Sequence, residues 1–219
     1  MTKYKLTYFD GRGGAEPIRM AFAAGGVEFE DVRVQIAEWP SLKPKTPQGH
    51  LPVLEVNGKT LCQSMAILRY VGKECGFYGK QSWEQGQIDC MVDTLADIWT
   101  THGRVIQEQN PSEQKQLITK HTDESIPKVL GIIEKALKDN SAGKGFLVGS
   151  ALTIADIRLY CTMDYPLMVY GFKLDKYPKV AAHRKMIEAI PKISEYMKKR
   201  PDDKIALELL IPMMKNCRI

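Results

Sequence analysis

The residues best placed to do chemistry lie between Tyr8 and Ser64. Tyr8 ends an apolar run just before the glycine-rich loop DGRGG, and loops at strand ends are where open α/β sheets bind ligands. Downstream, the loop TPQGHLP leads into an apolar run, and Gln63-Ser64 open an apolar helix. Loop-edge donors and free N–H groups at a helix start suit a small ligand that carries a carboxylate. A lone tyrosine is usually a packing residue, but its position opposite these donors makes Tyr8 a catalytic candidate.

Other kinds of site are not predicted. The histidines at 50, 102, 121 and 183 have no metal-ligand spacing with another histidine or with cysteine. No CxxC or G-x-S-x-G motif is present, and GRGG lacks the Lys-Ser/Thr pair of a phosphate loop. We therefore expect neither a metal nor a bound cofactor.

Composition indicates an ordinary soluble globular protein of 219 residues, 26% charged and 44% hydrophobic. The 31 basic and 26 acidic residues are intermixed, so the net charge of +5 does not predict nucleic-acid binding. Five cysteines without CxxC spacing favour reduced thiols over disulfides. No apolar run approaches about 18 residues, and MTKYKL does not read as a signal peptide. We expect a cytoplasmic protein with no membrane partner.

The first 80 residues alternate strands and helices. Apolar runs predict strands over 5–9, 29–34, 53–56 and 60–62, with helices over 16–24 and from Ser64, which is expected to be the N-cap. Asn57-Gly58 is the strongest short signal for a two-residue hairpin turn. The segment 36–45 is expected to be irregular. This order is the thioredoxin-like plan.

From Trp83 the hydrophobic period changes to 3.6 and stays there. Helices are predicted over 83–109, 112–138 with a kink at Pro127, 178–188 and 191–200, and a capping box at Thr153 and Asp156 predicts another. The fold class is therefore α/β plus all-α, with a thioredoxin-like domain over 1–79 and a helical domain over 83–219.

Two features of the sequence are expected to contact another part of the protein or another subunit. Asp89, Asp93 and Asp97 stack at i, i+4 and i+8 on one helix, where like charges repel. They either form a solvated face or meet cations of another subunit, and we expect a homodimer in which Arg69 faces them. The apolar tail from Ile205 onward is expected to fold against the helical domain at the rim of a pocket, and the alternative is packing elsewhere on the domain or disorder.

Taken together, these segments resemble the cytosolic glutathione transferases. The likeness is carried by LTYFDGRGGAEPIRM, WPSLKP, TPQGHLPVLEV, QSMAILRY, the capping box and ISEYMKKRP, and it covers nearly the whole chain. It is strongest for the sigma class, which includes haematopoietic prostaglandin D synthases, parasite and mollusc enzymes and the lens S-crystallins.

The resemblance implies roles for individual residues. Tyr8 would activate the glutathione sulfur, with Arg12 as the second catalytic residue. Leu51, before a cis Pro52, would pair with the backbone of the glutathione cysteine, and Asp97 would reach the amino group of the partner's glutathione. Glutathione would be a co-substrate. The implied binding residues are Tyr8, Trp39, Lys43, Gly49, His50, Leu51, Pro52, Gln63, Ser64 and Asp97. The implied electrophile pocket is Phe9, Gly13, Gly14, Arg104 and Arg158. The implied dimer interface includes Arg69, Asp89 and Asp93.

Three positions depart from the family pattern. Gly14 stands where the family often has arginine, which leaves Arg12 alone to supply positive potential near the sulfur. His50 replaces a common lysine or arginine, which gives a weaker, pH-dependent carboxylate contact. Ala96 and Arg104 replace an acidic residue and a tryptophan of the prostaglandin synthases, which argues against their metal-assisted specialisation.

The expected function is conjugation of the glutathione thiolate to hydrophobic electrophiles. Two alternatives stay open: a glutathione-dependent prostaglandin D isomerase, and a non-catalytic protein like the S-crystallins. The crystallins tend to carry a long insertion in the helical domain, and this chain has none.

Overall fold

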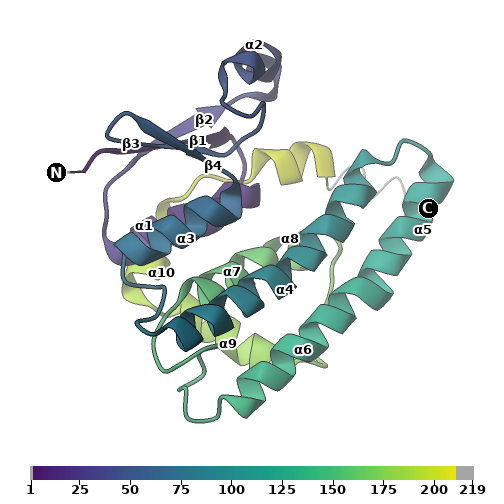
Figure 1. Ribbon diagram of the computed structural model, residues 1–219. Coiled ribbons are helices and arrows are strands. Elements are labelled where there is room, and N and C mark those ends of the chain that lie inside the picture. The colour runs from purple at the N-terminus through teal and green to yellow at the C-terminus, as the bar shows by residue number, and fades with distance from the viewer. Residues whose placement is uncertain (1, 211–219) are drawn as a thin grey trace.

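The computed structural model describes residues 2–210, apart from the side chain of Leu209. A small sheet lies over helices α1 (Glu16–Gly25) and α3 (Ser64–Glu74), and the helical domain lies on their other side (Figure 1). Helix α1 packs against both α3 and the helices of the second domain. The expected thioredoxin-like domain followed by an all-helical domain is confirmed.

The sheet places the first strand at its centre. Its strands are β1 (Tyr4–Phe9), β2 (Glu30–Val34), β3 (Val53–Val56) and β4 (Lys59–Cys62), in the order β2-β1-β3-β4. Strand β1 is parallel to β2 and antiparallel to β3, and β3 forms a hairpin with β4. Asn57 and Gly58 both have positive φ, 49° and 82°, so the predicted hairpin turn is confirmed. This order brings the end of β1, with Tyr8, beside the chain that enters β3.

The helical domain surrounds one fully buried helix. Its helices are α4 (Ser82–Gln107), α5 (Pro111–Lys120), α6 (Ile126–Asp139), α7 (Ile154–Thr162), α8 (Asp164–Met168), α9 (Pro178–Glu188) and α10 (Pro191–Lys199). Every residue of α7 is buried. The predicted capping box starts it: Ala155 N–H donates to Thr153 Oγ1 at 3.2 Å, and Asp156 Oδ2 accepts from Thr153 N–H at 2.9 Å. Local capping thus fixes where the central helix begins.

Several element boundaries differ from the predictions. The helix expected over 112–138 is two helices joined by a π-helical turn at His121–Ser125, so Pro127 lies in the first turn of α6, where a missing N–H costs nothing. The segment expected to be irregular contains α2 (Trp39–Leu42) between 3₁₀ turns. Gln63, with φ +74°, takes the cap position of α3 that was expected for Ser64. Hydrophobic period alone does not show a π-helical turn, a four-residue helix or the residue that caps a helix.

The tail folds back onto the domain junction, as expected. Asp203 is buried, and its Oδ1 accepts the N–H of Ala206 at 3.1 Å. Ala206 and Leu210 are buried against α4 and the chain around α8. Figure 1 shows this yellow segment lying between the sheet domain and the end of α4. The tail prediction is confirmed up to residue 210, and residues 211–219 lie outside the description.

The described cysteines at 62, 75, 90 and 161 are all free thiols, as the spacing predicts, and Cys217 lies outside the description. Burial raises the pKa of Cys75 to about 11 and that of Cys161 also upward, so both stay protonated at neutral pH. Within residues 2–210, no helix is long and apolar enough to cross a bilayer.

Candidate functional site

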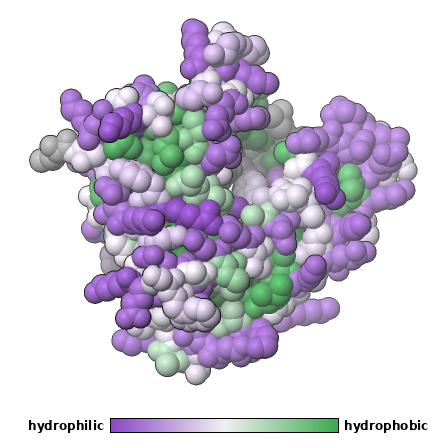
Figure 2. Space-filling view, viewed as in Figure 1, coloured by the Kyte–Doolittle hydropathy of each residue, from purple (hydrophilic) through white to green (hydrophobic). Residues whose placement is uncertain are grey.

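A cavity of about 700 Å³ lies where the two domains meet. Figure 2 shows a hollow between the sheet domain and the helical domain. One side of the cavity, here called the sheet-side wall, includes Tyr8, Gly13, Trp39, Leu51, Pro52 and Ser64. The other, the helix-side wall, includes Trp99, His102, Arg158, Tyr165, Ile205 and Leu210. Both domains and the tail are therefore needed to build it.

Tyr8 presents a hydroxyl that is already held in place. Gly14 N–H donates to Tyr8 Oη at 3.1 Å, which uses an oxygen lone pair and leaves the hydroxyl proton free for another acceptor. Burial raises the pKa of Tyr8, although the Gly14 bond and the nearby Arg19 cation act in the opposite direction. Tyr8 is therefore protonated at neutral pH, and its hydroxyl is available as a hydrogen-bond donor.

The two glycines beside Tyr8 differ in what they tolerate. Gly13 has φ +42°, and a Cβ at this position would lie 2.5 Å from Tyr8 Oη. At Gly14 a Cβ would make ordinary contacts, 3.8 Å from Tyr8 Oη and 3.5 Å from Ser64 Cβ. Glycine is thus required at 13 by both backbone and space, whereas at 14 the Tyr8 contact comes from the backbone and a side chain fits.

The helical domain fixes this glycine loop in place. Tyr165 donates to Asp203 Oδ2 at 3.0 Å and accepts from Gly13 N–H at 3.3 Å. Asp203 Oδ2 also accepts the backbone N–H of Arg12 at 3.1 Å. The loop that positions the Tyr8 hydroxyl is therefore held by α8 and by the tail.

The charge of Arg12 is paired with a carboxylate and is not free. Its Nη1 donates to Asp164 Oδ2 at 3.1 Å, and Asp164 also pairs with Arg184 and Arg200. Arg12 does not line the cavity. These contacts link the domains, and they do not support the prediction that Arg12 alone supplies positive potential at a bound sulfur.

Of the residues expected to bind glutathione, five line the cavity: Tyr8, Trp39, Leu51, Pro52 and Ser64. The Leu51-Pro52 bond is cis. Among the described residues, no backbone group hydrogen-bonds to the N–H or C=O of Leu51, so both are free to pair with a peptide. This loop edge offers backbone recognition to an extended ligand.

The other five lie outside the cavity lining. The Lys43 side chain packs beside Gly49, and Gln63 Nε2 donates to Gln48 Oε1 at 2.8 Å. His50 is exposed in the same loop, and Asp97 is exposed on α4. Their expected contacts with glutathione stay predictions.

The helix-side wall is aromatic and carries one charge. Arg158 lies with its guanidinium carbon 5.6 Å from the centre of the Trp99 ring. Burial lowers the pKa of His102 to about 4, so His102 is neutral at physiological pH. Phe9, Gly13, Gly14 and Arg158 line the cavity as expected for the electrophile pocket, whereas Arg104 is exposed and does not, because it points away from the face that carries Gly103 and Ile106.

The acidic column already has a cation from its own chain. Arg69 was expected to face the column of a partner chain, but here it donates to Asp89 Oδ1 at 2.6 Å and to Asp93 Oδ1 at 2.5 Å of its own chain. The pairing joins α3 to α4, which the separate helical patterns could not show. The role of these residues at a dimer interface stays a prediction.

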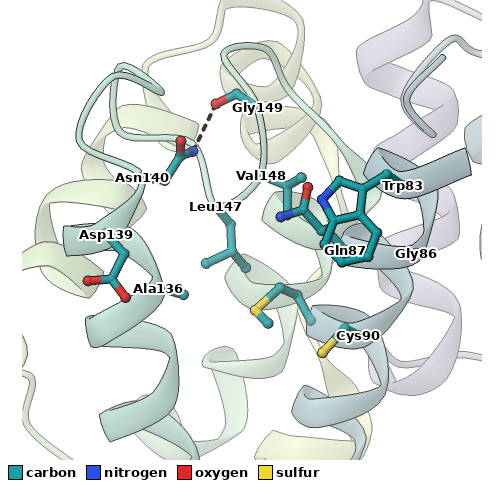
Figure 3. Close-up of a pocket in the computed structure, with 11 residues that line it drawn as sticks. Trp83, Gly86, Gln87, Cys90, Ala136, Asp139, Asn140, Leu147, Val148 and Gly149 are labelled. Carbon is teal, nitrogen blue, oxygen red and sulfur yellow. Dashed lines mark hydrogen bonds between the residues drawn. The ribbon is translucent and has the colours of Figure 1, made fainter. Parts of the chain in front are cut away.

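A second, larger cavity of about 840 Å³ lies between α4, α6 and the loop before α7. In Figure 3, Trp83 and Cys90 face it from α4, and Asn140 donates to the Gly149 carbonyl at 2.8 Å. Asp139 is its only charged lining residue among those described, and none of the residues predicted to do chemistry lines it. The cavity at the junction, which contains Tyr8 and Ser64, is therefore the better candidate site.

Sequence reasoning missed several residues of the junction site. Trp99 and His102 lie on the helix predicted over 83–109, but its helical period does not show which part faces a cavity. No sequence pattern pointed to Tyr165. One did point to Asp203, because an aspartate just before the apolar run that starts at Ile205 is an N-cap pattern.

Comparison with known proteins identifies the family. Two family profiles match: glutathione S-transferase, N-terminal domain, over residues 4–73, and glutathione S-transferase, C-terminal domain, over residues 96–200. S-crystallin SL11 of Nototodarus sloanii is 37% identical over 201 residues, which cover 91% of this chain and 98% of that one. Haematopoietic prostaglandin D synthase of Mus musculus is 38% identical over 207 residues, covering 94% and 100%.

Among solved structures, prostaglandin synthase D of Nilaparvata lugens aligns with a TM-score of 0.86 at 35% identity, covering 91% of this chain and 99% of that one. A mixture of prostaglandin synthases and S-crystallins is what the sigma-class resemblance predicts. The profiles span both domains, and the relatives align over almost their full lengths. The chain belongs to the glutathione S-transferase family.

Proposed function

We propose that this chain conjugates glutathione to hydrophobic electrophiles at the junction cavity. The observation that carries the proposal is the Tyr8 hydroxyl, held by Gly14 N–H at 3.1 Å with its proton free. Glutathione lies along the sheet-side wall, where Leu51 offers its backbone to the glutathione cysteine. The electrophile lies against the helix-side wall, whose lining is mainly apolar.

In this reaction the glutathione thiol first loses its proton to solvent. The thiolate then attacks an electrophilic carbon, a C–S bond forms, and a leaving group departs with its bonding electron pair. The Tyr8 O–H donates to the sulfur throughout and remains protonated. Chemistry of this kind requires the enzyme to stabilise the thiolate more than the thiol.

The required stabilisation is within the reach of one hydrogen bond. A free thiol has a pKa of about 8.5, and lowering it to about 6.5 takes ~2.7 kcal/mol, at about 1.36 kcal/mol per unit. A hydrogen bond to a charged group contributes about 1.5–3 kcal/mol. Tyr8 can therefore supply most of the effect, and free N–H groups at the start of α3 can add the rest.

The assembly and the site of action are also proposals. We place the protein in the cytoplasm as a homodimer in which Asp97 reaches the partner's glutathione. Exposure of Asp97 on α4, away from its own cavity, supports this arrangement. Light scattering at micromolar concentration should give a mass of two chains, and a single-chain mass would rule the dimer out.

Retention on immobilised glutathione, followed by an assay with 1-chloro-2,4-dinitrobenzene, tests the function. We expect elution by free glutathione and formation of the aryl thioether well above the uncatalysed rate. Retention without turnover would contradict conjugation and favour a binding protein like the S-crystallins.

A second candidate is glutathione-dependent isomerisation of a prostaglandin endoperoxide. It is favoured by the similarity to the mouse and Nilaparvata prostaglandin synthases. Turnover of an endoperoxide without turnover of aryl halides would favour the isomerase.

The absence of a long insertion does not distinguish this chain from the crystallin relative. An alignment of 201 residues covers 98% of SL11 and leaves no room for an insertion there.

A further inference from the structure

Arg158 is a buried cation for which residues 2–210 provide no anion. It lies on the central helix α7, is 3% exposed, and lines the junction cavity from the helix-side wall. Within the same residues, its Nε and Nη1 are buried and have no hydrogen-bond partner. The Trp99 ring lies beside it, at 5.6 Å. Burial lowers the pKa of Arg158 to about 10, which still leaves the side chain charged at neutral pH.

The other buried arginine shows what this chain normally provides. Arg19 is fully buried, and it donates to Asp31 Oδ1 at 2.9 Å and to the Gly11 carbonyl at 2.7 Å. Glu16 lies 3.7 Å from its guanidinium. Because a buried charge is costly unless it is paired, an arginine left unpaired in a cavity wall indicates a partner that arrives from outside.

The cavity around Arg158 fits one kind of partner. Among the described lining residues there is no carboxylate, and Arg158 is the only charged side chain. The rest of the helix-side wall is mainly apolar or aromatic, with Thr100 as an uncharged polar residue, and His102 there is neutral. The backbone donors expected to hold glutathione are on the opposite wall. An incoming anion on this side therefore belongs to the second substrate.

We propose that Arg158 binds the carboxylate of the electrophile, so that the preferred substrates are hydrophobic electrophiles that carry a carboxylate group. This inference rests on the proposed function, and it names the substrate class of the same site. The guanidinium matches a carboxylate in shape and charge, and Trp99 supplies an apolar surface for the carbon chain beside it. An anion of this kind completes the pairing that the fold leaves open.

Two matched aryl chlorides, 4-chloro-3-nitrobenzoate and 4-chloro-3-nitrobenzamide, test the proposal. In both, the glutathione thiolate attacks the carbon that bears chlorine, a C–S bond forms, and chloride leaves with the C–Cl electron pair. Each kcat/KM is divided by the uncatalysed rate, which removes the difference in intrinsic reactivity. We expect Arg158→Gln to lower the carboxylate-to-amide ratio by about 10–100-fold, as for loss of a charged hydrogen bond.

Two further variants control for charge and for folding. Arg158→Lys retains the positive charge and should restore part of the ratio. Lys128→Gln removes one exposed charge from α6 and should keep the wild-type ratio. A ratio in Arg158→Gln equal to that of the wild type would overturn the proposal, and so would a raised KM for glutathione, which would assign Arg158 to glutathione instead.

A binding measurement separates this inference from the proposed function. Calorimetric titration of the glutathione-loaded protein with decanoate and with 1-decanol measures anion recognition without chemistry. We expect Arg158→Gln to weaken decanoate binding by about 10–100-fold relative to decanol. If the wild type binds decanoate through Arg158 but turns over neither aryl chloride, conjugation fails and the anion subsite stands. Equal decanoate binding by both proteins would overturn the subsite whatever the turnover.

Discussion

The two walls of the junction cavity are built by different means. On the sheet-side wall, the polar groups available to a ligand include backbone atoms, such as those of Leu51, and the Tyr8 hydroxyl, which a backbone N–H holds in place. On the helix-side wall they are side chains from three helices, including Trp99, Arg158 and Tyr165. Backbone groups offer the same chemistry whichever residue carries them, whereas side chains change with every substitution. The first wall suits one constant ligand, and the second suits a second substrate that can vary.

The two walls are nevertheless mechanically joined. Tyr165 and Asp203 hold the glycine loop from the helix side, and Arg69 ties α3 to α4. A change on one wall can therefore reach the other through these contacts and through the packing of α1 against the helical domain. The predictions below test how separate the walls are, and they start with the largest expected effect.

Gly13→Ala should lower kcat by about 10–100-fold. A Cβ 2.5 Å from Tyr8 Oη would displace the hydroxyl, and a misplacement of about 1 Å can cost about 100-fold in rate. Gly14→Ala is the matched control, because its Cβ fits and its N–H still holds Tyr8. Steady-state kinetics with an aryl halide measure both variants. Equal activity of the two would show that the sheet-side wall does not depend on this close approach.

Acidic pH should lower the free energy of unfolding, because two histidines of the helical domain are buried in their neutral form. Burial lowers the pKa of both His102 and His121 from 6.5 to about 4, so the unfolded chain binds more protons between these values. Stability is therefore lost as the pH falls from 6.5 toward 4, by about 1–2 kcal/mol for each histidine at pH 5. Urea unfolding at pH 7 and pH 5 measures the loss.

His121→Gln should reduce the difference between the two pH values, because glutamine cannot take up the proton. His50→Gln, at an exposed loop position, is the control and should leave the difference as in the wild type. A pH dependence unchanged by His121→Gln would assign the acid sensitivity to other groups.

Truncation after Asp203 should raise the KM for a hydrophobic electrophile by about 3–10-fold, the loss expected from one or two buried methylenes. Ile205 and Leu210 line the helix-side wall, whereas Asp203, which holds the glycine loop, is retained. The KM for glutathione should change less. Truncation after Leu210 keeps this part of the wall and is the control. Equal changes in both KM values would contradict a role of the tail in the electrophile pocket alone.

Arg69→Gln should have the smallest effect, a loss of about 0–1 kcal/mol in the free energy of unfolding, because its ion pairs with Asp89 and Asp93 are partly exposed. Since the pairs lie within one chain, the loss should not depend on protein concentration. Urea unfolding at two protein concentrations measures it. A loss that grows on dilution would place Arg69 in contact with a partner chain.

Local patterns were enough to predict the sheet-side wall. The Asn57-Gly58 turn, Pro52 and the glycines after Tyr8 each restrict the backbone within a few residues, and the positions of Leu51 and Ser64 follow from them. The fold class followed from the change of period near Trp83. What the sequence predicts well is geometry that neighbours along the chain determine.

The helix-side wall could not be predicted in this way. Tyr165 and Asp203 are 38 residues apart, and Arg69 is 20 residues from Asp89, so only packing brings them together. The resemblance to the family placed Arg158 in the pocket, but its lack of a partner is a property of the three-dimensional surroundings. Arg12 shows the converse, since its place in the motif did not determine where its side chain points.

The central claim, that Tyr8 stabilises the glutathione thiolate, is tested most directly by ultraviolet titration of glutathione bound to the wild type and to Tyr8→Phe. The variant lacks the hydroxyl that Gly14 N–H positions and keeps the ring. We predict that its bound thiol has a pKa about one to two units higher, with nearly unchanged affinity and about 10–100-fold lower turnover at neutral pH. An unchanged pKa and wild-type turnover would contradict the account.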